Sequence, residues 1–119
     1  MQNNTRIGDF GENIAEGFLR AKGYEILAKK YKAVNGEIDL VAKLDDVVVF
    51  VEVKLRRSLK SGYGAESVTK TKQRSIIRTA TRYIQKERTP CRAYRFDVIE
   101  VFGREQYEVK HIEGAFYAE

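Results

Sequence analysis

"GEIDLVAKLDDVVVFVEVKLRR", residues 36–57, decides the fold of this 119-residue chain. It contains two apolar runs, 37–42 and 47–55, which are typical of β-strands and are joined by Asp45 and Asp46. Aspartate suits a tight turn, so the stretch predicts an antiparallel hairpin. The run "VVVFV" is apolar at every position, which indicates a central strand covered on both faces. A helix is therefore expected on each side of the sheet.

The rest of the chain extends this hairpin into a larger sheet. Apolar side chains recur at three- and four-residue steps within 10–22 and within 68–87, which predicts two amphipathic helices. Further strands are expected at 24–32, at 94–102 and, as a last short strand, within 107–116. The order αβββαβ(β) predicts one domain of the α/β class, with a mixed β-sheet flanked by helices.

Charged side chains interrupt both strands of the hairpin. Counting outward from the turn places Asp39 opposite Glu52 and Glu37 opposite Lys54. Facing carboxylates repel each other unless a cation lies between them or a pKa shifts. Mg²⁺ and Mn²⁺ prefer oxygen ligands, and a nearby lysine can orient an attacking water or neutralise a phosphate. The set therefore suits metal-assisted hydrolysis of a phosphodiester.

A second interpretation of these charges stays open at this point. The hairpin is then half-exposed, both carboxylates point to solvent, and Glu37 and Lys54 form an ordinary cross-strand ion pair. Val48 and Phe50 share the face of the charged residues, however. Their presence favours a cleft at the end of a buried strand.

Two motifs in the hairpin resemble a known nuclease family. "GEIDLVA" followed by "FVEVKLR" is similar to the motif set of the PD-(D/E)XK superfamily, the restriction-endonuclease-like fold that includes archaeal Holliday junction resolvases. With "GDFGENIAEGFLRAKGYEIL", "KTKQRSI" and "YRFDVIEV", the chain resembles the YraN family of small bacterial proteins over roughly residues 8–102. The resemblance implies that Asp39 and Glu52 bind Mg²⁺ or Mn²⁺, with the Val53 carbonyl as a third ligand. It also implies that Lys54 is the catalytic lysine.

The same resemblance implies roles for residues on both helices. Glu12 matches a glutamate that joins the metal site in resolvase-like members, although Asp9 and Glu12 also match a helix N-cap and its capping-box partner. Gln73, together with Lys72, matches a polar position that faces the active site in many members. Leu55 departs from the family pattern, which has a small polar residue after the lysine.

A basic surface is expected beside this site. No acidic residue lies between Glu66 and Glu87, and five of the six cations there repeat at every fourth position, as a ridge about 24 Å long. The preceding loop adds more cations and an aromatic ring. The ridge and the loop suit a phosphate backbone, DNA more than RNA, although a solvated helix face is the alternative. The residues concerned are Lys70, Lys72, Arg74, Arg78, Arg82 and Lys86 in the helix, and Arg56, Arg57, Lys60 and Tyr63 before it.

The whole sequence therefore predicts a metal-dependent nuclease that selects DNA structure, such as branches or junctions, because no base-reading motif is present. The alternative is a non-catalytic nucleic-acid-binding module of a DNA-processing complex. Cutting two strands of a junction requires a symmetric dimer, and the sequence leaves a homodimer open.

Composition limits the setting in which the protein works. The formal net charge is +5 and the pI is about 9.3, which favours a polyanionic partner. A single cysteine, Cys91, and an N-terminus without the apolar core of a signal peptide point to the cytoplasm. No apolar run approaches the roughly 20 residues that span a bilayer. His111 is expected to have a structural role. Asp97 is not among the candidate site residues.

Overall fold

The computed structural model describes residues 2–34, 36–56, 68–103 and 105–118, with the side chains of 2–8 excepted. Arg57, Lys60 and Tyr63 lie outside the described residues. The elements are α1 (Gln2–Ala21), β1 (Glu25–Ala33), β2 (Gly36–Leu44), β3 (Val47–Arg56), α2 (Lys70–Glu87), β4 (Ala93–Gly103) and β5 (Tyr107–Phe116).

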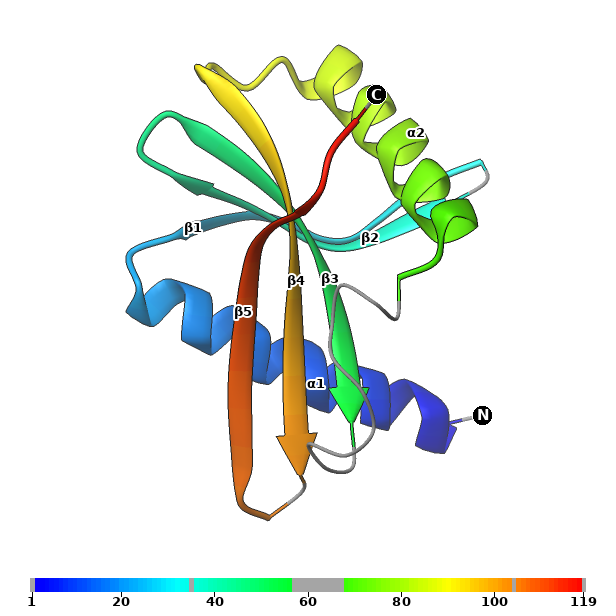
Figure 1. Ribbon diagram of the computed structural model, residues 1–119, viewed down its shortest axis with the longest axis vertical. Helices are drawn as coiled ribbons and strands as arrows, with labels where there is room; N and C mark the ends of the chain where they lie inside the picture. The colour runs from blue at the N-terminus through cyan, green and yellow to red at the C-terminus, as the bar shows by residue number, and fades with distance from the viewer. Residues whose placement is uncertain (1, 35, 57–67, 104, 119) are drawn as a thin grey trace.

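The strands form one five-stranded sheet in the order β1-β2-β3-β4-β5. The β3–β4 pair is parallel and the other three pairs are antiparallel. Helix α2 crosses from β3 to β4 on one side of the sheet, and α1 lies on the other side (Figure 1). The predicted α/β class, a mixed sheet flanked by helices, is confirmed. Neither helix, as far as the chain is described, is long and apolar enough to cross a membrane.

The hairpin has the predicted register. The β2–β3 ladder runs from Leu44 opposite Val47 to Leu40 opposite Val51. Asp45 in the turn adopts a left-handed conformation with φ of 52°, which aspartate tolerates better than most residues. The turn therefore fixes which side chains face each other at the far end of the hairpin.

Strand β3 is buried on both faces, as its apolar sequence predicts. Val48 and Phe50 pack under α2, whereas Val49 and Val51 pack under α1. Each face has its own apolar cluster, and burial of these side chains holds the helices against the sheet. The helical members are Ile76, Ala80 and Tyr83 from α2, and Ala15 and Leu19 from α1.

Helix α1 is longer than predicted, and the difference changes the interpretation of Glu12. The helix starts at Gln2, eight residues before the expected start at Phe10. Hydrophobic periodicity marks only the turns that pack on the sheet, so it misses the polar first turns. Asp9 therefore lies inside the helix, and the capping-box alternative for Glu12 is wrong. Both carboxylates instead bind Lys30 Nζ, at 2.9 Å for Asp9 and 3.1 Å for Glu12.

Gly36 sets how closely α2 approaches β2. A Cβ atom at this position would lie 2.3 Å from Thr79 Oγ1 and 2.7 Å from Ser75 Oγ. We expect Gly36→Ala to lower the free energy of unfolding by about 1–3 kcal/mol, because α2 must move away from the sheet. Gly11→Ala is the matched control, since its Cβ would meet Val53 and Leu55 at an ordinary 3.7 Å. Urea denaturation of both variants tests this; equal stabilities would contradict it.

Candidate functional site

The site begins where the β2–β3 ladder ends. Beyond the Leu40–Val51 pair, the Val53 N–H donates a hydrogen bond of 2.8 Å to Asp39 Oδ2. The N–H and C=O of one strand residue point toward the same neighbouring strand, so the Val53 carbonyl faces Asp39 as well. The Val53 N–H and the Asp39 carboxylate therefore meet at this point, and ligation of a metal by the Val53 carbonyl stays a prediction.

The Asp39 and Glu52 carboxyl groups come together at this point. Glu52 is buried with 6% of its surface exposed. Burial, the negative charge of Glu52 and a hydrogen bond to Glu52 raise the pKa of Asp39 to about 7, although the Val53 N–H lowers it. At neutral pH Asp39 is therefore partly protonated, which reduces the repulsion between the two carboxyl groups. The alternative in which both carboxylates point to solvent is therefore wrong for Glu52. The ion pair that it expected between Glu37 and Lys54 is replaced by others, because Glu37 pairs with Lys32 at 3.8 Å and Lys54 pairs with Glu52.

Two lysines flank the carboxyl pair. Lys54 Nζ lies 3.5 Å from Glu52 Oε2, and Lys72 Nζ from α2 lies 3.7 Å from the same oxygen. The sequence predicts Lys72 on the basic surface and, by family resemblance, places Lys72 with Gln73 at a position facing the site. The structure brings only Lys72 to the carboxylates. The Gln73 amide nitrogen donates to the Val68 carbonyl at 2.9 Å, and its role at the site stays a prediction.

Glu12 lies near the pair but is held by another partner. Burial raises the pKa of Glu12, the hydrogen bond from Lys30 lowers it, and the charge of Asp39 raises it further. Within the described residues, no group of three or more Asp, Glu, His or Cys side chains is placed to hold a metal ion. The carboxylates that the structure gathers are therefore two, and ligation by Glu12 stays a prediction.

The donor set fits a hard divalent cation. Two carboxylates and the Val53 carbonyl supply oxygen atoms alone, which Mg²⁺ and Mn²⁺ prefer, with water completing the coordination. The raised pKa of Asp39 supports the fit, because a pair of carboxyl groups that repel each other gains most from a shared cation. Val53 and Leu55 otherwise pack toward α1, so the unusual Leu55 does not face the site.

Strand β2 changes its side-chain alternation at the site, which the sequence does not reveal. Ile38 packs in the α2-side cluster with Val41, whereas strict alternation would place it on the α1 side with Leu40. In β1, Tyr31 lies opposite Ile38, and the preceding residue, Lys30, adopts φ of 50°. The irregularity brings Asp39 within reach of both Val53 and Lys30's partner Glu12.

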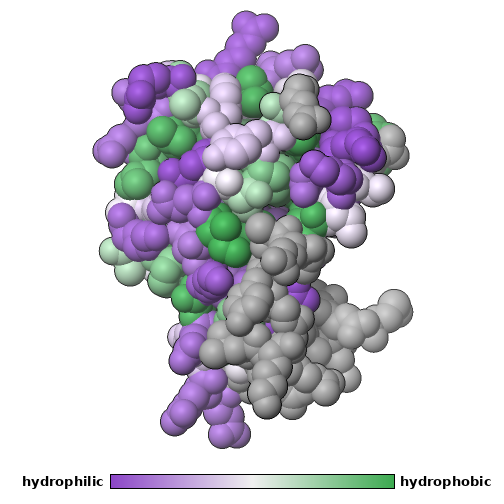
Figure 2. Space-filling model, in the orientation of Figure 1, coloured by the Kyte–Doolittle hydropathy of each residue, from purple (hydrophilic) through white to green (hydrophobic). Residues whose placement is uncertain are grey.

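The predicted basic ridge is present on α2. Five cations are exposed along the helix, and none of them forms an ion pair within the described part of the chain. Most other described cations are paired with carboxylates, as Lys29 and Arg95 are. Figure 2 shows hydrophilic side chains spread over much of this face, the α2 side included. The ridge consists of Lys70, Arg74, Arg78, Arg82 and Lys86.

Arg56 differs from the ridge cations because it turns into the protein. Its Nε lies 3.4 Å from Oε2 of the fully buried Glu100. Its Nη2 and Glu100 Oε1 are buried and have no hydrogen-bond partner among the described residues. Its pairing with Glu100 sets Arg56 apart from the ridge, and its contact with nucleic acid stays a prediction.

A second polar cluster, which the sequence did not predict, lies under α1. Asp97 is fully buried and accepts hydrogen bonds from Arg95, from His111 Nε2 at 2.7 Å and from the Gly114 N–H at 3.0 Å. Burial alone would raise the pKa of Asp97, but these hydrogen bonds outweigh it and hold the pKa below its ordinary value. His111 therefore has the structural role that was expected of it.

We predict a pH effect from Asp39. Its folded-state pKa of about 7 lies above its ordinary value of 3.8, so its contribution to stability is complete below pH 4 and is lost as pH rises through 7. Asp39→Asn cannot ionise, so between pH 5 and 8 in EDTA it should lose less stability than wild type, by about 1–3 kcal/mol. Urea denaturation at both pH values measures this. Parallel pH profiles would contradict it.

Comparison with known proteins places these residues in a family. The model of the uncharacterised protein family UPF0102 matches residues 11–101. A UPF0102 protein of Clostridioides difficile is 46% identical over 114 residues, which cover 96% of this chain and 99% of the relative. UPF0102 proteins of Caldicellulosiruptor saccharolyticus (44%, covering 92% and 93%) and of a Sulfurihydrogenibium species (40%, covering 97% of each) are also similar.

Proposed function

We propose that this chain, which belongs to the uncharacterised protein family UPF0102, is a nuclease that hydrolyses DNA phosphodiester bonds with Mg²⁺ or Mn²⁺. The observation that carries the proposal is the buried Asp39–Glu52 pair, with the Asp39 pKa raised to about 7 and Lys54 Nζ 3.5 Å from Glu52. Membership of the PD-(D/E)XK superfamily and a cytoplasmic location are part of the proposal.

The chemistry follows from the donor atoms. A divalent cation bound by Asp39, Glu52 and the Val53 carbonyl would polarise a phosphoryl oxygen and favour ionisation of a water. Lys54 is partly exposed beside Glu52, so its ammonium can donate to a non-bridging phosphate oxygen or orient the attacking water. Lys72, which extends from α2, offsets the negative charge of Glu52 and so reduces the repulsion between the acidic pair and the phosphates of the substrate.

The basic ridge supports DNA as the substrate. The ridge lies on the same helix as Lys72, which reaches Glu52, and its members Lys70 and Arg74 are each two residues from Lys72 along the chain. A phosphate backbone laid along the ridge would release counterions from each contact it makes. The contacts carry no base information, so selection by the shape of the DNA, such as branches or flaps, is the expected specificity.

Cleavage of labelled linear, flapped and four-way DNA in Mn²⁺ tests the proposal. We expect wild type to cut at least one branched substrate faster than the linear one, and Asp39→Ala to abolish the activity because the carboxyl pair is broken. Equal cleavage by wild type and Asp39→Ala would assign the activity to a contaminant and contradict the proposal.

The alternative function is a binding module without turnover, and the unpaired ridge is the observation in its favour. The same samples discriminate the two. Tight binding of branched DNA with no cleavage in Mg²⁺ or Mn²⁺, and no effect of Asp39→Ala, would favour the module.

A further inference from the structure

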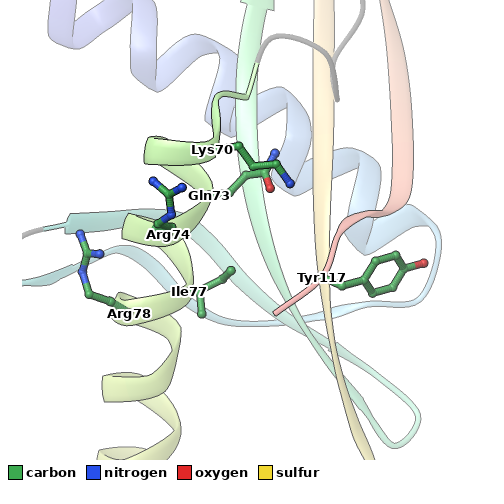
Figure 3. A pocket seen from close by; sticks show the side chains of 6 residues that line it. All are labelled: Lys70, Gln73, Arg74, Ile77, Arg78 and Tyr117. Atoms are coloured by element: carbon green, nitrogen blue, oxygen red, sulfur yellow. The ribbon is translucent and has the colours of Figure 1, made fainter. Parts of the chain in front are cut away.

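A hollow of ≈ 460 Å³ lies between α2 and the C-terminal segment. Its volume falls in the range of pockets that hold small ligands. Figure 3 shows Ile77 between the helix and the C-terminal segment, with Lys70 and Gln73 extending toward the strands. The lining residues are Lys70, Gln73, Arg74, Ile77, Arg78 and Tyr117.

The hollow lies along the helix that carries Lys72 to the candidate site. Lys72, in the same turn of α2 as Lys70 and Gln73, reaches Glu52 at 3.7 Å. A DNA strand whose phosphate lies at Asp39 and Glu52 would reach this hollow by following α2. None of its three cations, Lys70, Arg74 and Arg78, forms an ion pair among the described residues. Their charge suits a phosphate group.

The other wall of the hollow is apolar and aromatic. Tyr117 is 74% exposed, and in Figure 3 its ring lies at the rim, turned away from α2. Its backbone is anchored by the preceding residue, because Phe116 is buried and stacks on Phe96 with ring centroids 5.1 Å apart. An exposed aromatic ring next to cations is the usual platform for an unstacked base.

We propose that this hollow binds one nucleotide of the DNA strand whose base has left the stack. The phosphate lies on Arg74 and Arg78, and the base contacts Ile77 and, after rotation of its exposed side chain, the ring of Tyr117. The inference rests on the proposed function and names its substrate class, which is DNA with an unpaired segment beside the cut site. A paired base is held in its stack, so duplex DNA presents its phosphates to the ridge and leaves the hollow empty.

Binding measured without turnover tests the inference. Fluorescence anisotropy with a labelled oligothymidine and with a hairpin duplex, both in Ca²⁺, reports affinity independently of cleavage. We expect Tyr117→Ala to weaken oligothymidine binding about tenfold or more and duplex binding by less than about twofold, because stacking is lost. Tyr117→Phe should keep both affinities. Arg78→Ala should weaken both DNAs and reduce the salt slope by about 0.7–0.9.

Tyr107 is the matched control. It is 49% exposed and lines a hollow on the α1 side with Phe10 and Phe18, away from the ridge. Tyr107→Ala should leave both affinities unchanged. If Tyr117→Ala weakens neither DNA, or both equally, while Arg78→Ala weakens both, the inference is wrong and the proposed function stands. If thymidine monophosphate competes as well as the oligomer, the hollow is a free-nucleotide site and the inference is wrong. If wild type binds neither DNA, both proposals fail.

Discussion

Glu52→Gln is expected to lower Mn²⁺-dependent cleavage by about 10²–10⁴-fold, since a metal ion supplies several kcal/mol of charge stabilisation and each 1.4 kcal/mol is tenfold in rate. Glutamine keeps the size of Glu52, which is 6% exposed, but removes one anionic ligand and the partner of Lys54 and Lys72. The substitution also removes a charge that raises the pKa of Asp39.

Two measurements separate this effect from misfolding. In EDTA at pH 8, the Glu52→Gln protein should be at least as stable to urea as wild type, because the repelling pair is gone. Branched-DNA binding in Ca²⁺ should be reduced far less than cleavage. The matched control is Glu37→Gln, whose carboxylate is exposed on the same strand as Asp39 and pairs with Lys32. The cleavage rate of Glu37→Gln should lie within about threefold of the wild-type rate. Equal rates for the two variants would contradict the site.

The second large effect is expected far from the candidate site. Asp97→Ala should lower the free energy of unfolding by about 3–5 kcal/mol, because it leaves Arg95 and His111 without their buried carboxylate. Arg95 also donates to the Tyr24 hydroxyl at 2.7 Å, and His111 Nδ1 lies 2.8 Å from Lys22 Nζ. The cluster thus ties β4 and β5 to the end of α1.

Urea denaturation measures this loss, with two comparisons. Glu113→Gln removes an exposed carboxylate that touches Arg95 at 3.5 Å, so it should change stability by about 1 kcal/mol or less. Asp97→Asn keeps an acceptor for Arg95 or Gly114, so its loss of stability should lie between those of Asp97→Ala and Glu113→Gln. It replaces Asp97→Ala in the comparison if the alanine variant does not fold. A loss no larger for Asp97→Ala than for Glu113→Gln would show that the cluster adds little to stability.

Local sequence rules predict the hairpin and the facing of its charges, and the reason is the turn. Because Asp45 and Asp46 fix the register, the position of Asp39 near Glu52 follows by counting. The length of the polar start of α1 could not be predicted in this way, since no apolar stripe marks it. The role of Asp97 could not be predicted either, for a different reason. Its partners Arg95, His111 and Gly114 lie on two strands, and the local sequence does not show that they meet.

The details of the site depend on contacts between elements that counting along one strand cannot reach. The changed alternation at Ile38 accompanies the left-handed Lys30 on the neighbouring strand. The approach of Lys72 to Glu52 requires the packing of α2 on β2, which Gly36 permits. Family resemblance pointed to the position of Lys72, whereas the pattern of charges alone placed it with the ridge.

The order of the strands in the sheet is the order in the chain, β1 to β5. No strand has to insert between two strands that already pair, and only the β3–β4 step must wait for a long loop to close around α2. Folding can therefore proceed outward from the β1–β2–β3 meander, whose contacts are local and form early. On the ribosome, the two strands that carry Asp39 and Glu52 would be available to pair with each other before the residues of β4 have been synthesised.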